Sequence, residues 1–127
     1  MTLQEFKNNY SVTDGELLTL YLEYGSNNSK DLDRITIKFN GKKFLPIEKF
    51  ETVIFSLEFN ELLEFNYYEK FDCKTISQST MTKTSLGQFY LSLDPFHEDN
   101  PSEEDNMIIK SKELFFIDPF GIKHQII

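Results

Sequence analysis

The sequence is short of several residue types, and each shortage excludes a class of protein. Cys73 is the only cysteine, so neither a disulfide within the chain nor a zinc site built from several cysteines is possible. There is no tryptophan, and only 5 glycines are present, which leaves little material for a glycine-rich phosphate-binding loop. The zinc-protease helix motif and the dinucleotide fingerprint are also absent. We therefore expect no catalytic residues, no cofactor and no metal.

Positive charge is scarce as well. Lys and Arg number 13 and Asp and Glu number 21, so the formal net charge is −8. Nucleic acids and anionic membrane surfaces are both bound through Lys and Arg, so this balance argues against either as a partner. It permits a basic protein partner, whose approach an acidic surface accelerates. The alternative is that the surplus charge serves solubility alone.

Long apolar runs are missing too. No stretch approaches the roughly 20 apolar residues that a membrane-spanning helix needs, and residues 1–5 lack the features of a secretory signal. Together with the single cysteine, these observations predict a cytosolic protein. At 127 residues the chain is expected to form one domain, residues 1–127, that is large enough to bury a core without disulfides.

Aromatic side chains are what the sequence has in abundance, with 13 Phe and 6 Tyr. Such side chains suit a pleated, half-buried surface. Short alternating segments with turn signals between them predict a strand-dominated α+β domain. We expect a twisted antiparallel meander or a partly closed barrel, with a short amphipathic helix over residues 2–10. The expected turns are Thr13-Asp14-Gly15, residues 25–29, Asn40-Gly41, Asn60-Glu61 and residues 118–121.

Two segments have a less regular pattern than the other predicted strands. Residues 47–59 fit a helical stripe and a strand equally well, and their β-branched and aromatic content favours a strand over residues 52–59. The hydroxyl-rich residues 75–85 are predicted to form either a sheet edge or a solvent-covered ribbon. The other expected strands are residues 16–24, 34–39, 42–45, 88–93, 107–110, 113–117 and 122–127, with one more around Leu63, Phe65 and Tyr67.

The candidate site is an acidic loop, residues 94–105, between two apolar strands. We interpret it as a docking surface for a basic partner, and the alternative is a solvated connection. A calcium site is a third interpretation, but the oxygen ligands do not follow the spacing of the twelve-residue calcium loop, and no glycine lies at its centre. The acidic residues of the loop are Asp94, Glu98, Asp99, Glu103, Glu104 and Asp105.

His97 and His124 are the only histidines. Ser92, His97 and Asp99 supply the residue types of a catalytic triad, but no nucleophile elbow or oxyanion-forming turn surrounds them. We expect ordinary surface histidines. The aromatic residues of segment 65–71 are expected to pack in the core rather than to stack on bases, because Lys70 is the only basic residue there.

Three segments of the last third carry a resemblance to a known family. They are Phe-Tyr-Leu-Ser-Leu-Asp-Pro-Phe (89–96), Pro-Ser-Glu-Glu-Asp-Asn (101–106) and Ile-Ile-Lys-Ser-Lys (108–112). They resemble small, acidic, β-rich bacterial immunity proteins of polymorphic or contact-dependent toxin systems. The resemblance implies a non-enzymatic cytosolic protein that binds and neutralises a cognate toxin, for which a basic nuclease is a candidate. It carries over no site residues.

A different class of function is a structural or oligomeric β module of the bacterial cytosol. In that interpretation the hydroxyl-rich ribbon, residues 75–85, pairs edge to edge with a second copy. We expect a monomer or a weak homodimer.

Overall fold

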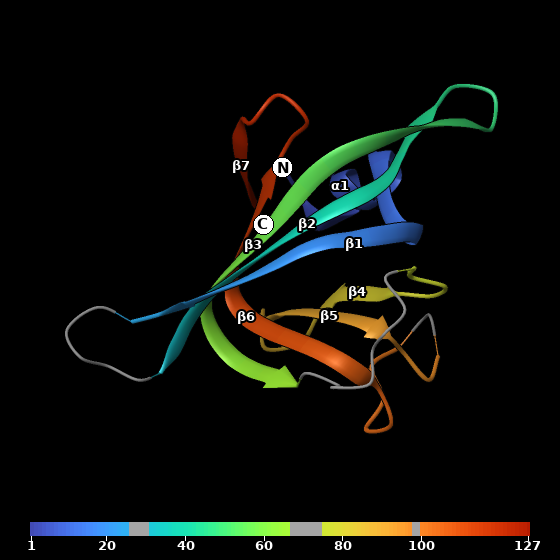
Figure 1. Cartoon of the computed structure of the whole chain (residues 1–127). Coiled ribbons are helices and arrows are strands. Elements are labelled where there is room, and N and C mark those ends of the chain that lie inside the picture. Colours follow the sequence, from blue (N-terminus) through green and yellow to red (C-terminus); the bar gives the residue numbers. More distant parts are fainter. Residues whose placement is uncertain (26–30, 67–74, 98–99) are drawn as a thin grey trace.

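The computed structural model describes residues 1–25, 31–66, 75–97 and 100–127 (Figure 1). This part of the chain contains one short helix at the N-terminus and seven strands, which confirms the predicted strand-dominated α+β class. Among the described residues, no helix has the length and apolar character that crossing a membrane requires. The elements are α1 (Leu3–Asn9), β1 (Tyr10–Tyr24), β2 (Leu32–Leu45), β3 (Lys49–Asn66), β4 (Thr80–Lys83), β5 (Phe89–Asp94), β6 (Asn106–Ile117) and β7 (Lys123–Ile126).

The strands form one antiparallel sheet in the order β1-β2-β3-β6-β5-β4, and β7 pairs with β6. β1, β2 and β3 form one meander, and the chain then crosses to the far edge of the sheet, where β4, β5 and β6 form a second. In Figure 1, β3 and β6 bend from the upper layer, which holds β1 and β2, into the lower layer with β5 and β4.

The bend brings the two ends of the sheet toward each other without closing a barrel. Among the described residues, one isolated bridge, Glu16 to Thr75, joins β1 to the segment before β4. Two backbone hydrogen bonds accompany it, from Asp14 N to Ile76 O and from Ile76 N to Gly15 O. We call the line along which residues 7–16 face residues 75–81 the seam. The predicted edge position of the ribbon is confirmed, since β4 is the last strand of the sheet order.

Asn40-Gly41 is not a hairpin turn, so that prediction was wrong. β2 runs straight through it, and Gly41 pairs with Val53 of β3. A Cβ atom built on Gly41 would lie 2.6 Å from the Phe55 ring and 2.7 Å from the Ser11 carbonyl oxygen. The glycine is therefore required by the close approach of neighbouring groups rather than by a turn.

The hairpin between β2 and β3 instead lies at residues 46–48, where Ile47 and Glu48 have positive φ angles of 64° and 53°. The helical alternative for residues 47–59 was wrong, and the favoured strand over residues 52–59 is confirmed within β3. The two strands expected at residues 107–110 and 113–117 are one continuous strand, β6.

Two further expected turns are irregularities inside strands. Asp14 and Glu61 have φ angles of 62° and 53°, and each lies beside a shift in the strand register. These are the properties of β-bulges, which bend a strand without ending it. The predicted turn at Thr13-Asp14-Gly15 and the predicted hairpin at Asn60-Glu61 were therefore wrong, although each segment contains a residue with a positive φ angle.

The core is built largely from aromatic rings. The Phe6 and Phe116 centroids lie 5.1 Å apart, and those of Tyr10 and Phe116 lie 4.6 Å apart. A helix of seven residues is too short to persist in water alone, so α1 depends on burying Phe6, which is 2% exposed. Thr2 caps it, because its hydroxyl oxygen accepts a hydrogen bond from the backbone N–H of Glu5.

Candidate functional site

The acidic loop is held by its own last residue. Asp105 is 3% exposed, and its carboxylate accepts hydrogen bonds from the backbone N–H groups of Phe96 (2.8 Å) and Ser102 (2.9 Å). The Tyr90 hydroxyl donates a third, at 2.5 Å. Asp105 therefore ties both ends of the loop to β5, and this residue of the predicted docking surface is turned inward.

The other loop carboxylates of the described chain face outward. Asp94, Glu103 and Glu104 are exposed, and we call these three residues the acidic face. Asp94 is also contacted by Asn106, whose side-chain amide donates to it at 3.3 Å. Glu98 and Asp99 lie outside the described residues.

Burial and hydrogen bonding set opposite demands on the pKa of Asp105. Burial alone would raise its pKa, but the hydrogen bonds from Tyr90, Ser102 and Phe96 outweigh it, and the net pKa is lowered. The pKa of Tyr90 is raised by burial, by the same hydrogen bond and by the nearby charges of Asp105 and Glu64. At neutral pH the loop is thus fixed by a charged acceptor and a neutral donor.

A hollow of about 440 Å³ lies beside the acidic loop. The Tyr90–Asp105 pair contributes to its wall, Glu64 and Glu103 add carboxylates, and Lys110 adds one positive charge. Asn66, Pro101, Ser102 and Ile108 complete the lining. The hollow connects the loop with the carboxylate of Glu64 on β3, while β6 contributes Ile108 and the positive charge of Lys110.

Ser92 and His97 do not form part of a triad. Ser92 is buried, and its hydroxyl donates to the Asn106 carbonyl oxygen at 2.6 Å. The His97 ring is exposed and packs against the Phe96 ring, with centroids 4.5 Å apart. Asp99, the third residue of the triad considered from the sequence, lies outside the described residues.

His124 lies at the opposite end of β6. Its Nε2 is 2.9 Å from Asp118 Oδ2, and its ring stacks on Phe116 at 5.7 Å. The hydrogen bond from His124 lowers the pKa of Asp118. This pair joins the residue that follows β6 to a residue of β7 and so stabilises the turn between the two strands. Within residues 1–25, 31–66, 75–97 and 100–127, no group of three or more His, Cys, Asp or Glu side chains is placed to hold a metal ion. Cys73 and Lys70 are outside these ranges.

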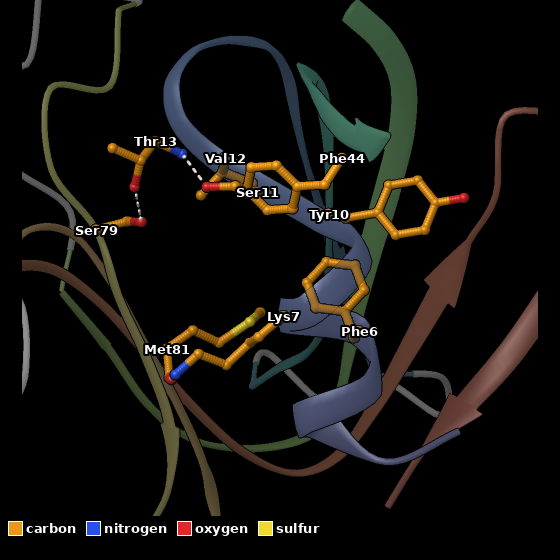
Figure 2. Close-up of a pocket in the computed structure, with 9 residues that line it drawn as sticks. All are labelled: Phe6, Lys7, Tyr10, Ser11, Val12, Thr13, Phe44, Ser79 and Met81. Carbon is orange, nitrogen blue, oxygen red and sulfur yellow. Dashed lines mark hydrogen bonds between the residues drawn. The ribbon is translucent and has the colours of Figure 1, made fainter. Parts of the chain in front are cut away.

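A second hollow, of about 310 Å³, opens at the seam (Figure 2). The sequence interpretation missed it, because its walls come from α1, β1, the end of β2 and the segment around β4. The alternation of apolar and polar residues indicates which face of a helix or strand is buried. It does not indicate where two sheet edges leave a space between them. Its lining residues are Phe6, Lys7, Tyr10, Ser11, Val12, Thr13, Phe44, Ser79 and Met81.

Comparison of the chain with protein-family models, with curated proteins and with solved structures gave no match.

Proposed function

We propose that this chain is a non-enzymatic binding protein of the bacterial cytosol, an immunity protein that neutralises a basic toxin through its acidic face. The observation that carries the proposal is the anchoring of the acidic loop by Asp105, which holds exposed carboxylates on a fixed backbone. A solvated connection needs no such anchor. The cytosolic location is supported by the single cysteine of the sequence.

An anchored loop is favourable for binding for an entropic reason. Ordering a mobile loop at an interface costs free energy, which is subtracted from the affinity. The three hydrogen bonds to the Asp105 carboxylate order the loop when the chain folds, so this entropy is lost before any partner binds. Asp94, Glu103 and Glu104 can therefore meet a partner's Lys or Arg side chains without a large loss of loop entropy.

Charge and size are compatible with such an interface. The net charge of −8 accelerates encounter with a cationic surface such as a nuclease cleft. A standard interface takes about 800 Å² from each partner, roughly a tenth of the 7947 Å² that this chain exposes. The hollow beside the loop, with Glu64 and Glu103 in its wall, adds a concave anionic region to that area.

The test is binding to the protein encoded next to this gene, measured by calorimetry over a salt series. The variant Asp94→Lys/Glu103→Lys/Glu104→Lys is expected to lose at least tenfold in affinity and to flatten the salt dependence. Asp105 is left unchanged, because a lysine at this buried position would disrupt the loop itself. Co-expression with the neighbouring protein should restore growth only with the parent chain.

A matched control separates the acidic face from total charge. Glu16, Asp33 and Glu51 are exposed on β1, β2 and β3, and changing all three to Lys alters the net charge equally, from −8 to −2. The control should retain affinity. If both triple variants lose affinity equally, the effect comes from the net charge and not from the acidic face. If the acidic-face variant keeps full affinity, the loop is not part of the interface.

The alternative, an oligomeric module that pairs through the ribbon of residues 75–85, meets an obstacle at the seam. Hydrogen bonds from Lys7 Nζ to Met81 O (2.9 Å) and between the Thr13 and Ser79 hydroxyls (2.6 Å) occupy part of that edge. Sedimentation over a range of concentrations distinguishes the two proposals. A stable dimer that Lys7→Gln strengthens would favour the module.

A further inference from the structure

The seam hollow is bracketed by two hydrogen bonds that cross between the sheet edges. On one side the Thr13 hydroxyl meets the Ser79 hydroxyl, and on the other Lys7 donates to the Met81 carbonyl oxygen. Figure 2 shows these links at the left, with Phe6, Tyr10 and Phe44 on the other side of the hollow. The links hold the edges at a distance where strand pairing is not formed, and the space between them stays open.

The lining combines an apolar floor with a few polar groups. Phe6 and Val12 are buried in the floor, and Tyr10, Phe44 and Met81 add further apolar surface. Ser11, Thr13 and Ser79 add polar side chains to the wall. Ligand pockets have this composition, and the volume of about 310 Å³ is at the lower end of their range of roughly 300–1,000 Å³.

Lys7 gives the hollow a charge preference. Its ammonium has three donors, and the hydrogen bond to Met81 O uses one of them. Across the described residues, no carboxylate oxygen lies within 4.0 Å of Lys7 Nζ. In a chain of net charge −8, a cation without a carboxylate partner beside an apolar hollow is suited to an anionic ligand.

We propose that the seam hollow binds a small monocarboxylate with an apolar body, such as a medium-chain fatty acid or an aromatic acid. The apolar body lies against Phe6, Val12 and Tyr10, and the carboxylate accepts hydrogen bonds from Lys7. The volume corresponds to on the order of ten water molecules, which limits the ligand to about ten non-hydrogen atoms. The site is separate from the acidic face and does not depend on its function.

The experiment titrates the ¹⁵N-labelled chain with octanoate and with octanamide, which has the same shape and no charge. Octanoate should shift the amide signals of residues 6–13 and 79–81 and bind about tenfold more tightly than octanamide, as expected for one hydrogen bond to a charged group. Lys7→Gln should remove this preference, so that octanoate and octanamide bind with the same affinity. Lys7 is exposed, so the substitution leaves the core intact.

Lys112→Gln is the matched control, because Lys112 is an exposed lysine on β6. It should keep the tenfold preference for octanoate. The proposal is overturned if millimolar octanoate leaves the signals of residues 6–13 and 79–81 in place, or if the preference survives Lys7→Gln. Shifts confined to other segments would likewise overturn it.

Discussion

The Tyr90 hydroxyl donates a hydrogen bond to Asp105 Oδ2 at 2.5 Å, which links the second residue of β5 to the residue that precedes β6. Both residues are buried, with Tyr90 5% and Asp105 3% exposed. Through Asp105, this contact reaches the backbone of Phe96 and Ser102, near the two ends of the acidic loop. The stability of the fold and the position of the acidic face are therefore coupled.

Tyr90→Phe tests that coupling. The variant keeps the ring but leaves the Asp105 carboxylate without one of its three donors, so we expect a loss of about 1.5–3 kcal/mol in the free energy of unfolding. Urea denaturation measures it. Tyr21→Phe is the control, since Tyr21 is 61% exposed, and it should change stability by less than about 0.5 kcal/mol. Equal stability of the two variants would contradict the anchoring role of Tyr90.

Stability should fall in acid because two buried carboxylates have lowered pKa values. Burial alone would raise the pKa of both Asp105 and Glu58. Hydrogen bonds from Tyr90 and the loop amides lower the pKa of Asp105, and hydrogen bonds from Lys123 and Asn60 lower that of Glu58. The unfolded chain then binds more protons than the folded one below the ordinary values of 3.8 and 4.5. The stabilisation is present above those values and is lost as the pH falls through the folded-state pKa values.

Denaturation midpoints measured from pH 7 to pH 2 check this dependence. Asp105→Asn and Glu58→Gln should each lower stability at pH 7 and flatten the decline in acid. Asp33→Asn is the control, because Asp33 is exposed on β2, and it should follow the parent curve. A parent curve that stays flat down to pH 2 would show that neither carboxylate is stabilised in the fold.

Gly41→Ala should destabilise the sheet by about 3 kcal/mol, because the new Cβ meets the Phe55 ring at 2.6 Å and the Ser11 carbonyl oxygen at 2.7 Å. Chemical denaturation measures it. Gly121→Ala is the comparison, since nothing lies within 4 Å there and only its φ of 85° opposes a side chain, at a cost of about 1 kcal/mol.

The double variant Gly41→Ala/Phe55→Leu identifies the source of the strain. Leucine is smaller than the Phe55 ring, so the double variant should lose less stability than the sum of the two single variants. Additive losses would mean that Phe55 is not the obstacle at Gly41.

Local features were predictable from the sequence because they depend on neighbouring residues. The amphipathic pattern of residues 2–10 predicted α1, and the β-branched and aromatic content of residues 52–59 predicted their strand character. Asp118-Pro119-Phe120-Gly121 formed the expected turn, since residues 118–121 contain both its hydrogen-bonding side chain and its glycine. The composition likewise determined the net negative charge and the strand-dominated class.

The tertiary structure decided the rest. Asn40-Gly41 has the residues of a hairpin turn, but its conformation is set by Phe55 and Ser11, which are distant in sequence. Asp105 looks like its exposed neighbours Glu103 and Glu104, and it turns inward because Tyr90 and two loop amides supply its hydrogen bonds. The seam hollow arises where two edges of one bent sheet approach each other and, among the described residues, pair only at the Glu16–Thr75 bridge. Each of these depends on contacts between distant segments, whose geometry exists only once the sheet has bent on itself.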